Sequence, residues 1–109
     1  MDVVPADALR TDREIVVEVE NASGRRGLAR QVTRLLRERG VDVLDFSSVD
    51  STVAVTQILV RREPASKGQE VARVLGAGVV TLALDTLRRL DVTVRLGRDY
   101  ILPPGRPPF

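Results

Sequence analysis

The chain has 109 residues, of which 43% are hydrophobic, and a formal net charge of +2, which together predict one globular domain with a modest aliphatic core. It contains no cysteine and no histidine. This excludes disulfides, cysteine or histidine catalysis, and metal sites built on thiolate or imidazole ligands. The sequence also lacks an apolar run long enough to cross a membrane.

The first predicted element is a strand. Residues 1–13 are polar and show no sustained period, so we interpret them as a flexible linker. In residues 14–20, Ile15, Val17 and Val19 alternate with the residues between them. This alternation predicts a β-strand with one buried face.

A helix is predicted from Gly27 to Arg39. Apolar residues recur along it at helical spacing, and they are Leu28, Ala29, Val32, Leu35 and Leu36. Such a stripe is typical of an amphipathic helix. Gly40 is expected to end the helix in the left-handed conformation. A strand over 41–46 and a loop over 47–53 follow.

The next elements repeat this alternation of strand and helix. Three consecutive apolar residues predict a strand over 56–60 that is buried on both faces. A second helix is predicted to begin at Ala65 or Ser66, with Ser66 preferred as its cap, and to stop at Gly76 and Gly78.

The chain then returns to strands, which are predicted at 79–84 and 92–96 with a connection over 85–91. The proline-rich residues 103–109 predict an extended tail. The order is therefore β-α-β-β-α-β with a further strand. We predict an α+β fold, a two-layer sandwich over residues 14–102 with both helices on one face of a mixed sheet. The element order is that of a split βαβ arrangement.

The junction between the first strand and the first helix is the most distinctive segment. In one interpretation its glycines permit tight turns, and Asn21 or Ser23 caps the helix. In the other, free N–H groups at the positive helix end act with two arginines to bind an anion. The candidate binding residues are Asn21, Ser23, Gly24, Arg25, Arg26, Gly27 and Arg30.

On these residues the chain resembles the LytR C-terminal domain family. That family shows a valine-rich strand, an Asn-small-Ser/Thr-Gly turn and a Gly-Leu-Ala helix start, which residues 17–24 and 27–29 match. Residues 36–43 and 92–100 match two later motifs, and the likeness extends over about residues 14–100. Between residues 47 and 85 it is carried mainly by the order of the elements.

The resemblance implies an extracytoplasmic module of bacterial cell-envelope proteins. Such domains follow the catalytic domain of LytR-CpsA-Psr enzymes, which attach anionic glycopolymers to peptidoglycan, or stand alone behind a membrane anchor. It therefore implies a non-catalytic module whose partner is an anionic cell-wall glycopolymer, its precursor or an envelope protein. Membrane contact would come only through an upstream anchor. We predict no catalytic residue, metal or cofactor.

Three further features keep alternatives open. Arg26, Arg30, Arg34 and Arg37 form either a solvated helix face, with Arg34 pairing to Glu38, or a stripe that binds a polymer. The segment 92–96 suggests an exposed strand edge that could form a homodimer.

The third feature is Tyr100. It is expected to pack at the rim of the core with its hydroxyl in water, or else to stack on a sugar. A nucleic-acid partner is disfavoured, because the Gly-x-x-Gly turn lacks accompanying aromatic residues.

Overall fold

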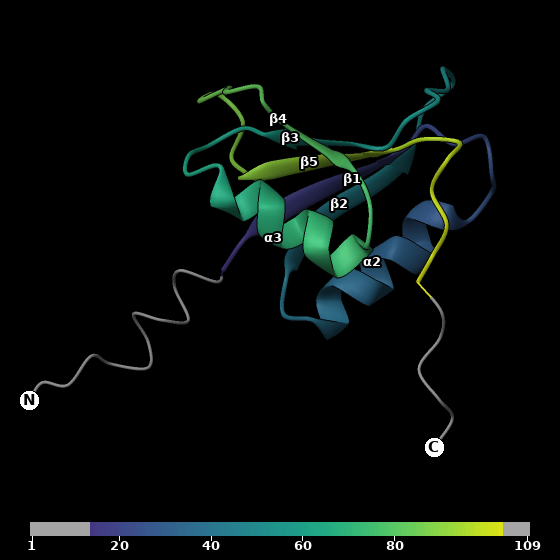
Figure 1. Ribbon diagram of the computed structural model, residues 1–109, viewed down its shortest axis with the longest axis horizontal. Coiled ribbons are helices and arrows are strands. Elements are labelled where there is room, and N and C mark those ends of the chain that lie inside the picture. Colours follow the sequence, from purple (N-terminus) through teal and green to yellow (C-terminus); the bar gives the residue numbers. More distant parts are fainter. Residues whose placement is uncertain (1–13, 104–109) are drawn as a thin grey trace, which may run out of the picture.

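The computed structural model describes residues 14–103 and is α+β (Figure 1). The predicted linker at 1–13 and residues 104–109 of the predicted tail lie outside the described residues. The elements follow the predicted order: β1 (Val16–Asn21), α2 (Leu28–Glu38), β2 (Asp42–Ser48), β3 (Gln57–Val60), α3 (Ser66–Leu75), β4 (Val79–Leu82) and β5 (Val92–Leu96).

The sheet is mixed and has the strand order β2-β1-β5-β3-β4. Strand β1 lies parallel to both β2 and β5, while β3 is parallel to β4 and antiparallel to β5. Each helix therefore connects two strands that are direct neighbours, and β5 lies between the two βαβ units. The α+β prediction is confirmed, whereas the split βαβ arrangement is wrong because no strand separates the two strands that a helix connects.

Both helices cover the same side of the sheet, as Figure 1 shows. Helix α2 packs on β1 and β2, and α3 packs on β3 and β4. The core between the layers is aliphatic, and its fully buried members include Val17, Val19, Val32, Leu36, Ile58, Val71, Leu75, Val92, Val94 and Leu96. The apolar stripes that the sequence predicts on each helix thus face a single core.

Two strand predictions need correction. Strand β3 was expected to be buried on both faces, but Leu59 is only half-buried between Ile58 and Val60, because the helices cover one face alone. The segment 92–96 was expected at an exposed edge, but β5 is hydrogen-bonded on both sides. The edges of the sheet are β2 and β4.

The boundaries also differ in detail. Strand β2 continues to Ser48, and β4 already ends at Leu82. Ala65, not Ser66, is the N-cap of α3, and no side chain caps that helix. Gly40 follows Arg39, the C-cap of α2, and Gly76 is itself the C-cap of α3. Both glycines adopt the left-handed conformation, with φ of 86° and 80°, as expected at the C-terminal ends of helices.

The face of the sheet opposite the helices carries paired charges. Glu18 accepts from Arg88 and, at 2.6 Å, from the hydroxyl of Thr93. Arg95 pairs with Glu20 at 2.9 Å. On this face, Arg88 of the connection between β4 and β5 and Arg95 of β5 are neutralised by carboxylates of β1.

Tyr100 closes the core after β5. Its side chain is fully buried, and its hydroxyl donates to the backbone carbonyl of Leu75 at 3.0 Å. The ring therefore packs as predicted, but the expectation that the hydroxyl stays in water is wrong. The neighbouring Asp99 accepts hydrogen bonds from the amide and the hydroxyl of Thr56, so residues 97–100 are fastened to the start of β3.

Replacing Tyr100 with phenylalanine should remove a pH dependence of stability. Burial raises the pKa of Tyr100 from 10.0 to about 12. The folded state holds this proton more tightly than the unfolded chain does. The resulting stabilisation, about 2–3 kcal/mol, is complete below the unfolded pKa and is lost as the pH rises through the folded one.

Urea unfolding of the wild type and of Tyr100→Phe would test this. The wild type should be more stable near neutral pH, since it also keeps the bond to Leu75, which contributes about 1 kcal/mol. The stability advantage of the wild type over Tyr100→Phe should shrink as the pH rises from the unfolded pKa of Tyr100 toward its folded pKa. A difference that stays constant there would contradict the assignment.

Candidate functional site

The turn between β1 and α2 is organised by the side chain of Asn21. Its amide nitrogen donates to the carbonyl of Arg25 at 2.7 Å. Its oxygen accepts from the amide of Ser23 at 3.1 Å and from the hydroxyl of Ser23 at 2.5 Å. The Ser23 hydroxyl oxygen in turn accepts from the amide of Arg25 at 3.0 Å. Both side chains are buried, so their polar atoms are used inside the turn.

This network overturns the prediction that Asn21 or Ser23 caps the helix. The N-cap of α2 is Gly27, with φ of 83° and no side-chain hydrogen bond to the first turn. Gly24 also has a positive φ, of 79°, which glycine adopts at little cost. The two glycines therefore bend the chain on either side of the arginines, and Asn21 stabilises the bend.

The remaining candidate residues divide into two groups. Gly24, Arg25, Arg26 and Gly27 are exposed, as is Arg30 in the first turn of α2. The guanidinium of Arg25, however, donates to the backbone carbonyl of Tyr100. Arg25 thus ties the turn to the segment after β5, while Arg26 and Arg30 extend from the surface without such a contact among the described residues.

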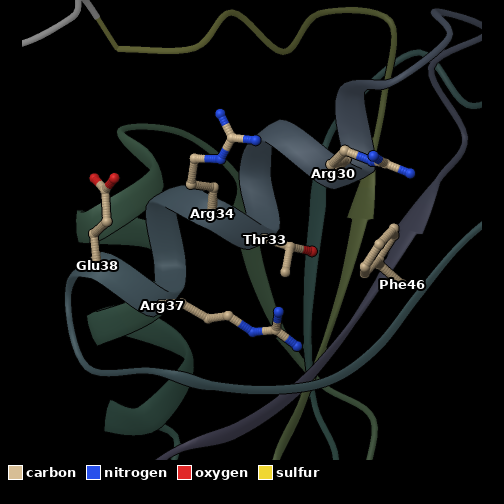
Figure 2. A pocket seen from close by; sticks show the side chains of 6 residues that line it. All are labelled: Arg30, Thr33, Arg34, Arg37, Glu38 and Phe46. Atoms are coloured by element: carbon tan, nitrogen blue, oxygen red, sulfur yellow. The ribbon is translucent and has the colours of Figure 1, made fainter.

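A pocket of about 460 Å³ lies between α2 and the edge strand β2. Its lining residues are Arg30, Thr33, Arg34, Arg37, Glu38 and Phe46. Figure 2 shows Arg30 and Arg37 extending toward Phe46 on either side of Thr33, whereas Arg34 and Glu38 point away. We call this site the α2–β2 pocket.

Thr33 is the unusual residue of the α2–β2 pocket. It is only 3% exposed, and its hydroxyl has no hydrogen-bond partner within residues 14–103. In Figure 2 the hydroxyl points toward Phe46. A buried hydroxyl usually finds a partner, and in a helix the carbonyl four residues earlier can provide one. An unpaired one is therefore a place where a ligand could supply the missing bond.

Positive charge is concentrated around this pocket. Residues 25–39 contain six arginines and a single carboxylate, Glu38, although the whole chain has a net charge of only +2. Among the described residues, neither Arg30 nor Arg34 forms an ion pair. Arg37 donates to the backbone carbonyl of Val43 at 2.8 Å. The cations of α2 thus differ from those of the open sheet face, which carboxylates neutralise.

Of the residues that line the pocket, Arg30, Arg34 and Arg37 are predicted from the sequence, whereas Thr33 and Phe46 are not. Thr33 falls three residues after Arg30 and four before Arg37, so helical spacing alone could have placed it between them. Phe46 could not have been added without the sheet register, which pairs it with the buried Val19 and thereby turns it to the helix side.

Other kinds of site receive no support in residues 14–103. No group of three or more acidic, histidine or cysteine residues is close enough there to hold a metal ion. None of the helices in that range has the length and apolar character needed to cross a membrane.

Comparison with known proteins agrees with this fold. The model of the LytR_C family, described as "LytR cell envelope-related transcriptional attenuator", matches residues 14–100. The chain belongs to the LytR_C family. This is a family of non-catalytic C-terminal attenuator domains, and membership implies an extracytoplasmic, cell-envelope-related domain.

A solved structure is similar to this LytR_C domain. It is the solution structure of the C-terminal domain of RV0431, with 28% sequence identity and a TM-score of 0.53. The match covers 89% of this chain and 79% of that one. No curated protein matches the chain. The resemblance that the sequence analysis drew from residues 17–29 and the later motifs is confirmed.

Replacing Thr33 with valine should stabilise the free domain. The substitution removes a buried hydroxyl without a partner and keeps the shape of the side chain, so a gain of about 1 kcal/mol is expected. Thr93 provides the matched control, because its buried hydroxyl donates to Glu18 and accepts from Arg61. Thr93→Val should therefore destabilise the domain.

Urea unfolding of both variants beside the wild type is the measurement. If Thr33→Val destabilised the domain as much as Thr93→Val does, the Thr33 hydroxyl would have a hydrogen-bond partner in solution. It would then not be free to bond a ligand.

Proposed function

We propose that this LytR_C domain is a non-catalytic module that holds an anionic cell-wall polymer, or its precursor, against the basic face of α2. The observation that carries the proposal is the set of arginines on α2 that form no ion pair with any carboxylate of residues 14–103, whereas several other cations of that range are in ion pairs. Arginine forks bind phosphate and carboxylate oxygens with two parallel hydrogen bonds.

The turn between β1 and α2 provides few groups that can bind a ligand. Its main role is to position the basic face of α2. The side chains of Asn21 and Ser23 are committed to the turn, and Arg25 is bonded to Tyr100. Gly24 and Gly27 shape the bend. Of the seven candidate residues, Arg26 and Arg30 are therefore the ones we assign to direct contact with the polymer, together with Arg34 and Arg37.

A cell-envelope role fits this chemistry. Family membership supplies the setting, and the anionic glycopolymers of the bacterial wall supply a partner of the required charge. The whole protein would be held at the membrane by an anchor upstream of this domain. We assign no catalytic step to the domain, since the polymer would be bound and positioned through charge.

A titration with poly(glycerol phosphate) tests the proposal. Arg30→Ala/Arg34→Ala should weaken binding by about tenfold or more, which is about 1.4 kcal/mol, and added salt should weaken binding to the wild type. The matched control is Arg62→Ala/Arg73→Ala, which removes the same charge from exposed residues elsewhere.

The control should bind like the wild type. Equal losses in the two double variants would mean that net charge alone drives binding, and unchanged binding in Arg30→Ala/Arg34→Ala would remove α2 as the site.

Self-association is the second candidate function. Its expected site moves from β5, which is internal, to an edge strand. The edge strand β4 exposes Val79 and Leu82 by 55% and 52%. An edge with exposed apolar side chains can pair with another strand. A homodimer would therefore form through β4, since β5 is internal.

Light scattering over a range of concentrations would test the β4 dimer. A dimer that Leu82→Lys converts to a monomer is the expected result. A wild type that stays monomeric at every concentration would exclude this second function.

A further inference from the structure

We infer that the α2–β2 pocket is a subsite for a single sugar ring that carries a phosphate group. This inference rests on the proposed function and adds the identity of the repeating unit. It predicts that the domain distinguishes a phosphate polymer with sugar rings from one without them. The subsite is formed by Arg30, Thr33, Arg37 and Phe46, which line the α2–β2 pocket (Figure 2).

The two arginines define a place for an anion. Arg30, Thr33 and Arg37 are spaced by three and four residues, so they follow one line along α2. Arg30 has no ion-pair partner among residues 14–103. Arg37 uses one nitrogen on the Val43 carbonyl, which steadies the guanidinium at the edge of β2 and leaves its other donors available.

Phe46 defines the place for a ring. It comes from the edge strand on the same side as α2 and is 38% exposed. The face of an aromatic ring packs well against the C–H face of a sugar, and the phosphate attached to that sugar would remain within reach of the arginines.

A single aromatic side chain favours a sugar over a nucleic acid. Proteins that bind single strands stack successive bases on several aromatic residues. This chain has three aromatic residues in all, and Tyr100 is buried in the core. Within residues 14–103, Phe46 is thus the one aromatic side chain that a ligand can reach.

Thr33 supplies the specific polar contact. Thr33 lines the pocket, and its hydroxyl is buried with no partner among residues 14–103. A sugar hydroxyl can both donate to it and accept from it. Because the Thr33 hydroxyl is buried in the free domain, side chains that line the pocket must shift for the sugar to reach it. The free hydroxyl of a glycerol phosphate unit lies on a flexible chain with no ring to pack on Phe46, so it is not held in place at Thr33.

The experiment compares two oligomers with the same number of phosphates, one of phosphodiester-linked hexose and one of glycerol phosphate. Calorimetric titration of the wild type should show a preference of about fivefold or more for the hexose oligomer. Thr33→Val and, separately, Phe46→Leu should abolish this preference and leave the affinity for the glycerol phosphate oligomer unchanged. Thr81→Val, at an exposed threonine of β4, should retain the preference.

The outcomes separate this inference from the proposed function. If Arg30→Ala/Arg34→Ala loses binding to both oligomers but the wild type shows no preference, the sugar subsite is refuted and the polymer-binding role stands. If neither oligomer binds, both fail. If Phe46→Leu does not fold, Thr33→Val alone decides.

Two further oligomers test the ligand class. A uronate oligomer of equal charge that binds as tightly as the hexose phosphate would overturn the assignment to phosphate. Oligothymidylate that binds more tightly than the hexose phosphate would overturn the assignment to a sugar. Weaker binding of both supports the inference.

Discussion

The hydrogen bonds of the Asn21 side chain are the interactions on which the proposed binding surface depends. Its amide nitrogen holds the carbonyl of Arg25, and its oxygen holds Ser23, so one buried carboxamide closes the bend between β1 and α2. Buried polar networks of this kind specify one conformation when every member is satisfied. The bend determines where α2 begins and, through it, which residues of the helix face β2.

From this constraint follows the division between the two sides of the domain. On the open face of the sheet, cations such as Arg88 and Arg95 meet carboxylates of β1. Burial, aided by the nearby Arg88, lowers the pKa of Arg61 on that face. Within the described part of the chain, the arginines on α2 form no ion pairs, and the helix presents its apolar stripe to the core and its basic stripe to solvent. The domain therefore has one face on which charges are paired, the open face of the sheet, and one basic face, that of α2, although its net charge is small.

Much of this fold could be predicted from the sequence, because alternation and helical spacing are local signals. The buried face is visible in the pattern of apolar residues within Glu14–Glu20 and within Gly27–Arg39. The position of β5 could not be predicted in that way, since the same alternation suits an edge or an internal strand, and pairing depends on distant partners. The helix cap was wrongly predicted for a related reason. Asn21 and Ser23 are residue types that often cap helices, but here their side chains bond to each other and to Arg25. The pocket needed the register that brings Phe46 to α2.

The most direct test of this account is the location of amide chemical-shift changes in NMR spectra during titration with the hexose phosphate oligomer. The account predicts changes centred on Arg30–Arg37 and Phe46, with the amides of Ser23 and Arg25 unshifted because side chains of the turn hold them. Changes centred on residues 23–27, with loss of those two hydrogen bonds, would show that the turn itself opens to bind the anion and would contradict the account.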